Sequence, residues 1–176
     1  MRTCIAIGGL MALGGLAALS AGGCGGVVDP TAEKTFRAKL GQASVTIFPA
    51  FVRAGGHGPK SYNPAAAQRI ADVWTETKLG TATVSDGEVP INAPWGMNQA
   101  KMFSGSLADF RAYVQQHPLK TDYALMAEYL FSGPDTVVGV HVYVLDADGV
   151  CPFAVLLNSH WEAFKAVNPK TVDDCT

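Results

Sequence analysis

Charged residues are scarce in this chain: Asp, Glu, Lys and Arg make up 16% of its 176 residues, and the net charge is −2. The 13 basic residues are scattered and form no basic run. Nucleic-acid-binding proteins usually carry a basic stripe that neutralises phosphates, so this pattern argues against nucleic acid as a partner. Apolar residues make up 48%, which excludes a disordered chain and is enough for one domain.

The motifs of several enzyme classes are also missing. No CxxC pair or Cys/His spacing typical of zinc occurs, and "GGHGPK" lacks the spacing of a phosphate loop. "DADG" (146–149) begins like a calcium loop, but Leu157 stands where such a loop needs Glu, so we expect a hairpin turn. "NSH" lacks the strained elbow of a nucleophile motif. The sequence therefore predicts no cofactor and no catalytic set.

The N-terminal segment has the pattern of an export signal. Residues 1–24 carry one charge, Arg2, followed by an apolar run from Ile5 to Leu19 and then by small residues. This order predicts a signal peptide over residues 1–23. The alternative is a membrane-spanning helix, but the run is shorter than the roughly 20 apolar residues that spanning takes, and it is rich in glycine.

The end of this segment, "AGGC", resembles the bacterial lipobox. The resemblance implies cleavage before Cys24, a lipid thioether on its sulfur and acylation of the new amino group. Residues 24–41 would then form a lipidated tether, and Gly25 in place of Asp after the cysteine favours the outer membrane over the inner one. The alternative is a cut near Ala21 or Gly23, which leaves Cys24 an ordinary thiol.

Two cysteines remain once Cys4 and Cys24 are assigned to the signal and the anchor. Cys151 and Cys175 would lie in an oxidising compartment after export, which predicts one disulfide between them. The alternative is a pair of buried thiols.

The hydrophobic pattern predicts one α/β domain over residues 42–176. Its expected order is β-α-β-α-β-β-β-α, in a mixed sheet of about five strands with helices packed mainly on one face. The predicted strands are 42–52, 81–86, 122–131, 136–146 and 151–158, and the predicted helices are 63–80, 98–117 and a last one after 158. The chain stops in the middle of this last pattern, so a truncated domain with a longer last helix is expected.

This order resembles the N-terminal domain of TolB and the related domains of CsgG-like periplasmic lipoproteins. The resemblance covers 42–158 and depends on "VTIFP", "AAAQRIADVW", "TDYALMAEYLF" and "GVHVYVLDADG". It implies a periplasm-facing interaction or assembly module without catalysis. The chain departs from that family in having no propeller, no evident pore-forming segment and an additional "NAPWGMNQAKMF" region.

Glu128 and His141 are the candidate titratable pair. If the 122–131 and 136–146 strands close at "SGPD", Glu128 lies opposite His141 and shares its face of the sheet. Such a pair is able to act as a proton relay, a metal half-site or a pH-sensitive contact, while the simplest interpretation is a cross-strand polar pair.

The loop "INAPWGMNQ" (91–99) is the candidate partner-binding site. It places Trp95, Met97 and Asn98 among residues typical of loops, and exposed aromatic side chains often anchor partners. The alternative is that Trp95 folds back onto the core.

These observations predict a lipid-anchored lipoprotein of the bacterial envelope that binds a protein partner and is not an enzyme. The alternative function is a metal- or small-ligand-binding enzyme that uses Glu128 and His141.

Overall fold

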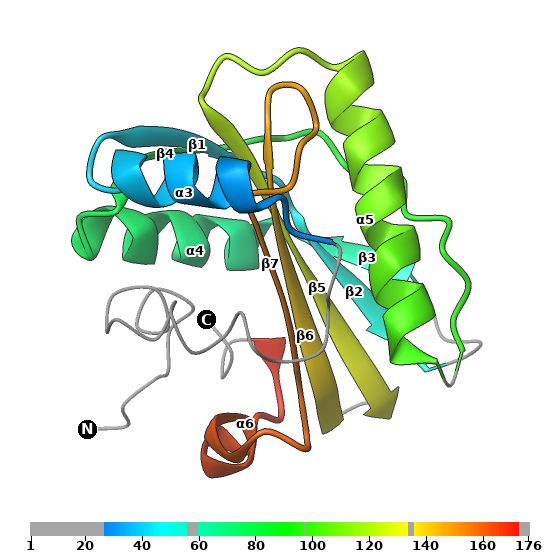
Figure 1. The fold of residues 1–176 in the computed structure, drawn as a ribbon. Coiled ribbons are helices and arrows are strands. Elements are labelled where there is room, and N and C mark those ends of the chain that lie inside the picture. The colour runs from blue at the N-terminus through cyan, green and yellow to red at the C-terminus, as the bar shows by residue number, and fades with distance from the viewer. Residues whose placement is uncertain (1–26, 56–59, 97, 134–135, 173–176) are drawn as a thin grey trace.

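The computed structural model describes residues 27–55, 60–96, 98–133 and 136–172. Within these ranges the chain forms one seven-stranded sheet and four helices (Figure 1). In chain order the elements are α3 (Pro30–Lys39), β1 (Ala43–Ile47), β2 (Ala50–Ala54), β3 (Lys60–Asn63), α4 (Pro64–Glu76), β4 (Gly80–Val84), α5 (Gln99–Gln116), β5 (Tyr123–Gly133), β6 (Thr136–Asp146), β7 (Phe153–Asn158) and α6 (Glu162–Val167). The predicted mixed α/β class is confirmed.

Strand β5 organises the sheet. One of its edges pairs with β1 over its first half and with β2 over its second half, both in parallel, and its other edge pairs with β6 in antiparallel. β4 lies beside β1 in parallel, while β3 and β7 are antiparallel to β2 and β6. The long β5–β6 hairpin therefore forms the centre of the molecule, and shorter strands extend it on both sides.

The single strand predicted over 42–52 is two strands. Pro49 has no backbone N–H to donate to a ladder, and β1 ends at Ile47 immediately before Phe48 and this proline. The chain then resumes as β2 along the same edge of β5. This break, together with β3 in a segment predicted as loop, raises the number of strands from about five to seven.

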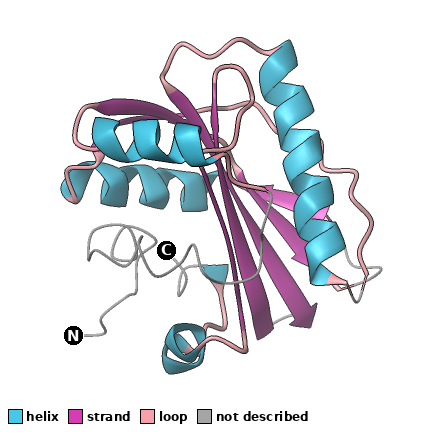
Figure 2. Ribbon diagram, in the orientation of Figure 1, coloured by secondary structure: helices cyan, strands magenta, loops and turns pink. Residues whose placement is uncertain are grey.

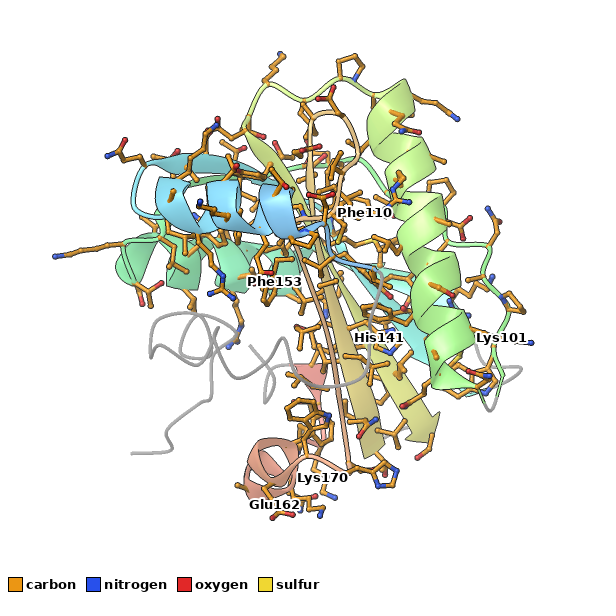
Figure 3. The ribbon with its side chains drawn as sticks, in the orientation of Figure 1. Lys101, Phe110, His141, Phe153, Glu162 and Lys170 are labelled. Carbon is orange, nitrogen blue, oxygen red and sulfur yellow. The ribbon has the colours of Figure 1, made fainter. Side chains whose placement is uncertain are left out.

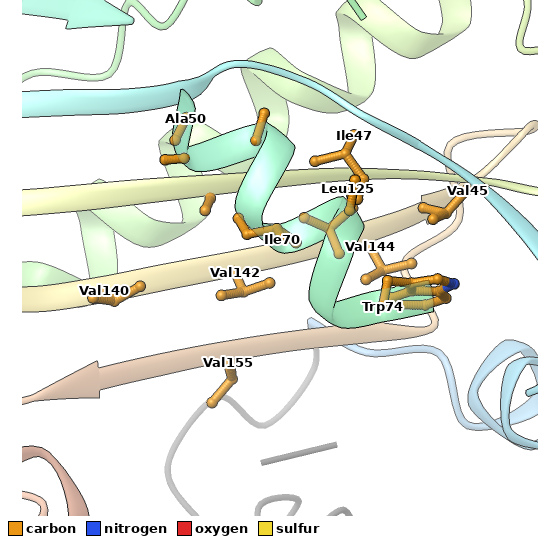
Figure 4. Close-up of a cluster of buried hydrophobic side chains, with 14 of the residues drawn as sticks. Val45, Ile47, Ala50, Ile70, Trp74, Leu125, Val140, Val142, Val144 and Val155 are labelled. Atoms are coloured by element: carbon orange, nitrogen blue, oxygen red, sulfur yellow. The ribbon is translucent and has the colours of Figure 1, made fainter. Parts of the chain in front are cut away.

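Helices cover both faces of the sheet, so the prediction of helices mainly on one face was wrong (Figure 2). α3 and α4 bury Phe36, Ile70 and Trp74 against one face, in a cluster with valines of β6 and β7. Figure 4 shows Ile70 and Trp74 of α4 in this cluster. α5 buries Phe103, Leu107, Phe110 and Val114 in a second cluster on the other face. β5 and β6 are nearly continuous runs of buried residues because both faces are covered.

The folded domain begins well before residue 42. The Asp29 carboxylate caps α3 by accepting a hydrogen bond from the backbone N–H of Ala32, and Pro30 occupies the first turn, where its missing N–H costs nothing. Phe36 is 1% exposed and packs edge-on against Tyr123 at 4.9 Å between ring centroids. The predicted tether over 24–41 is therefore corrected, because most of it is a helix of the core.

α5 agrees with its predicted limits, whereas α4 begins as predicted but ends at Glu76, because Gly80 already belongs to β4. Asn63 caps α4 through its side chain, as Asn98 does for α5, and α5 runs without a break through the Ser-Gly-Ser stretch at 104–106. None of the helices in the described ranges has the length and apolar character needed to cross a bilayer.

Candidate functional site

A buried polar network lies between the sheet and α5, with the Glu128 carboxylate at its centre. Arg53 of β2 donates from Nε to Oε1 of Glu128 at 3.0 Å, and its Nη2 lies 2.9 Å from the same oxygen. On the other side, His141 Nδ1 lies 2.9 Å from Oε2, and the Tyr143 hydroxyl donates to Oε2 at 3.1 Å. Three strands thus converge on one carboxylate.

The register of the sheet explains this convergence. Glu128 pairs with His141 across the β5–β6 ladder, as the sequence predicted, and Tyr143 follows two residues later on the same face. Across the opposite edge, Phe51 of β2 pairs with Glu128, so Arg53 also points to the face that α5 covers. A close approach of Arg53 was not predicted, because it depends on the break at Pro49.

The network is sealed from solvent. Glu128 and His141 are 0% exposed and Arg53 is 2% exposed. Phe103 of α5 covers the network, with its ring centroid 5.1 Å from that of His141 and 4.9 Å from that of Tyr143. Figure 3 shows His141 in this position between the strands and α5.

Electrostatics holds the Glu128 carboxylate ionised. Burial alone would raise the pKa of Glu128, but the hydrogen bond and charge of His141 and the charge of Arg53 outweigh it and hold this pKa below its ordinary value. Burial, together with the charge of the same carboxylate, holds the pKa of Tyr143 well above its ordinary value, so the phenol stays protonated and donates. A buried ion pair with extra donors is a stable arrangement that costs much to disrupt.

Metal ligation would need further ligands beside Glu128 and His141. Within the ranges that the structure describes, no group of three His, Cys, Asp or Glu side chains is placed to hold a metal ion. Nε2 of His141 is buried and has no hydrogen-bond partner among the described residues.

The Trp95 loop is an ordered segment attached to this network. Nη1 of Arg53 donates to the carbonyl of Ala93 at 2.6 Å, and one Asp109 carboxylate oxygen accepts from the backbone N–H groups of Asn92 and Ala93. Gly105 of α5 lets the loop come close, since a Cβ there would lie 2.8 Å from that of Ala93. No sequence pattern pointed to Asp109, which is an ordinary charged residue within a helix.

Trp95 itself is half-buried and lines an open pocket of about 370 Å³. The pocket lies where the N-terminal end of α5 meets the end of β7, and its wall includes Gln99, Asn158 and His160. Gln99 Oε1 accepts a hydrogen bond from Asn158 Nδ2 at 2.9 Å, which links the two elements. Trp95 is therefore neither fully exposed nor folded into the core.

The other predicted site residues lie outside the buried network, and some lie outside the described residues. Asn98 is exposed and accepts the backbone N–H of Lys101 as the cap of α5, while Met97 lies outside the described residues. Cys24 and Cys175 also lie outside them. Cys151 is buried, its thiol donates to the carbonyl of Phe153, and burial raises the pKa of this thiol to about 11.

Comparison with known proteins gives structural neighbours of low similarity. No protein-family model matches the chain, and no curated protein matches it. Among solved structures, the LpoB C-terminal domain from Salmonella enterica is 12% identical, with 76% of this chain and 96% of that chain covered and a TM-score of 0.40. The LpoB C-terminal domain from Escherichia coli is 11% identical, with 70% and 91% covered and a TM-score of 0.38.

The NMR structure of E. coli LpoB is 11% identical, with 72% of this chain and 66% of that chain covered and a TM-score of 0.32. These comparisons do not confirm the TolB- or CsgG-like resemblance. At these TM-scores the neighbours carry no argument about function. Any functional proposal must therefore be based on the residues of this chain.

Proposed function

We propose that this protein is a lipid-anchored lipoprotein of the bacterial envelope whose domain binds a protein partner, without catalysis, at the surface around Trp95. The observation that carries the proposal is the way the loop is held. A half-buried tryptophan lines an open pocket, and the segment leading to it is fixed by Asp109 and by the buried Arg53. Large, rigid aromatic side chains in such settings anchor protein partners.

The buried network supports a structural role for the titratable pair. A substrate would have to displace Phe103 to reach Glu128 or His141, both fully buried. The contact from Arg53 to the Ala93 carbonyl gives the network another task, which is to fix the loop that presents Trp95. Ordering the loop in advance lowers the entropy cost of binding a partner.

The lipid anchor completes the proposal. The lipobox-like "AGGC" places the anchor at Cys24, and a cysteine that carries two or three acyl chains is held stably in a bilayer. The location that follows is a membrane surface of the envelope facing the periplasm, with the outer membrane favoured by Gly25. The partner would be another envelope protein.

The test is photocrosslinking in cells that express the full chain. A photoreactive residue replaces Asn98, beside the pocket, and a matched control replaces Gln68, which is exposed on α4 at the opposite face. We expect a discrete adduct from position 98 that is absent from position 68. Trp95→Ala should weaken the affinity for the partner about 30-fold, which corresponds to a hot spot of about 2 kcal/mol, and the yield of the adduct should fall with it.

Two results would argue against partner binding at this surface. One is equal crosslinking from positions 98 and 68. The other is an adduct from position 98 whose yield is unchanged by Trp95→Ala, since the aromatic anchor would then contribute nothing.

A further inference from the structure

The start of the folded domain lies very close to the proposed lipid attachment. Val27 and Val28 are half-buried and pack against the α5-side cluster. The next backbone N–H, that of Asp29, donates to the carbonyl of Cys151 at 2.9 Å, which fixes the segment beside the start of β7. The chain is therefore held in the fold from residue 27 onward.

Only Gly25 and Gly26 separate Cys24 from Val27. Three Cα-to-Cα steps of about 3.8 Å span at most about 11 Å, whatever conformation the two glycines adopt. A domain of roughly 150 residues has a radius of gyration of about 15 Å. The connection is thus shorter than the radius of the domain, so a lipid on Cys24 would hold one face of the domain against the bilayer.

The face in question surrounds Val27 and the β6–β7 turn. An open pocket there, of about 630 Å³, is lined by Val27, Arg111, Gln115 and Val150. Arg111 Nε donates to the carbonyl of Gly149 at 2.8 Å, which attaches the turn to α5. Val150, at the tip, is 37% exposed and is the exposed large hydrophobic residue of the described chain. An apolar tip of this kind suits contact with the headgroup region of a bilayer.

The charge of this face is balanced rather than basic. Exposed Asp29 and Asp148 lie near Arg111 around the same pocket. Attraction to anionic lipids is therefore not what brings this face to the bilayer. The short connection between Val27 and the lipid anchor does so. The orientation should accordingly depend on the length of that connection and not on the charge of the bilayer.

The Trp95 pocket lies at the other end of the same elements. Gln115 lines the Val27 pocket and Gln99 lines the Trp95 pocket, and the 16 residues between them along α5 correspond to about 24 Å. β7 spans the same gap between the two pockets, since Phe153 to Asn158 covers about 17 Å from the Val27 end to the Trp95 end. Figure 1 places the C-terminal end of α5 and the β6–β7 turn together at one end of the molecule, and α6 at the other.

We infer that the domain rests on the bilayer that holds its anchor, with Val27 and the β6–β7 turn facing the headgroups and the Trp95 pocket directed away from the membrane. The inference depends on the proposed lipidation of Cys24. The pocket then lies within roughly 35 Å of the lipid surface, from the lengths of the connection and of α5. The partner is a protein whose binding segment lies within that distance of the same membrane, for example one embedded in it.

The experiment measures the distance of each end of the domain from the lipid. The full chain is expressed in a bacterium that processes lipoproteins, with an azide-bearing residue in place of exposed Gln115 or exposed Ser159 for attachment of a donor dye. The purified protein is reconstituted into phosphatidylcholine vesicles, with and without phosphatidylglycerol, that carry an acceptor dye on their headgroups. Energy transfer is compared for the two positions after flotation of the vesicles.

We expect transfer from position 115 to be several-fold faster than from position 159, with or without anionic lipid. A matched variant carries about 20 added Gly and Ser residues between Gly26 and Val27, a linker of roughly 25 Å, and should lose most of the difference. Equal transfer from the two positions, or faster transfer from 159, in protein that floats with the vesicles would overturn the orientation alone. Protein that fails to float would overturn the lipid anchor and this inference with it.

Discussion

Removing the charge of Glu128 should destabilise the domain far more than removing a comparable charge at the surface. The variant Glu128→Leu keeps most of the side-chain volume, so a cavity is not the main effect. It leaves the buried Arg53 guanidinium with the Ala93 carbonyl as its remaining acceptor, at 2.6 Å, and takes the acceptor at Oε2 from His141 and Tyr143. Breaking a buried ion pair in this way costs about 3–5 kcal/mol.

The measurement is urea unfolding at neutral pH, followed by circular dichroism and tryptophan fluorescence. The matched control is Glu162→Gln, because the Glu162 and Lys165 side chains form an ion pair that is 89% and 51% exposed. This control should change the free energy of unfolding by less than about 0.5 kcal/mol. A domain with a typical stability of about 5–15 kcal/mol would lose a large part of it in Glu128→Leu.

The double variant Arg53→Met with Glu128→Leu completes the cycle. It removes both buried charges together, so it should be more stable than Glu128→Leu alone. The single variant Arg53→Met is measured beside them. A loss below about 1 kcal/mol in Glu128→Leu, or losses of Glu128→Leu and Arg53→Met that simply add in the double variant, would mean that the two charges do not depend on each other.

Three other expectations concern the helix, the acid range and the thiol. Phe36→Ala should cost about 3–5 kcal/mol in the same unfolding assay, and a loss under about 1 kcal/mol would mean that α3 is not part of the core. Hydrogen bonds from Ser44 and the contact with Lys39 lower the pKa of Asp122 from 3.8 to about 2, so its stabilising effect is complete above pH 3.8 and is lost as the pH falls toward 2. The stability difference between the wild type and Asp122→Asn should therefore shrink over that interval, and a constant difference would contradict this. The buried Cys151 thiol, with its pKa raised to about 11, should resist alkylation at mildly alkaline pH until urea unfolds the protein, and rapid alkylation of the native protein would show that it is accessible.

Local signals in the sequence predicted the parts of the fold that depend on nearby residues. Two residues along the chain separate the end of β5 from the start of β6, so the register of this hairpin and the contact between Glu128 and His141 follow from counting along the chain. The predicted helix starts at 63 and 98 likewise agree with α4 and α5, which begin at Pro64 and Gln99. The Trp95 loop was recognised by its residue types, while its attachment to the fold was not.

The parts that could not be predicted depend on contacts between distant segments. Arg53 lies in a predicted loop and reaches Glu128 because β2 adds to the free half of the β5 edge, 75 residues away in sequence. α3 has a weakly apolar sequence and is identified as part of the domain by the burial of one residue, Phe36. The predicted pairing of Cys151 with Cys175 stays a prediction, since Cys175 lies outside the described residues.

Lipidation of Cys24 underlies both the proposed location and the proposed orientation, and intact-mass analysis of the protein purified from bacterial membranes decides whether it occurs. We expect a chain that starts at Cys24 and carries a diacylglyceryl group, with an added acyl chain on its new amino terminus. The same spectrum, taken before and after reduction, reports whether Cys151 and Cys175 are joined. A mature chain with an unmodified Cys24 thiol, or one that retains residues 1–23, would contradict the account.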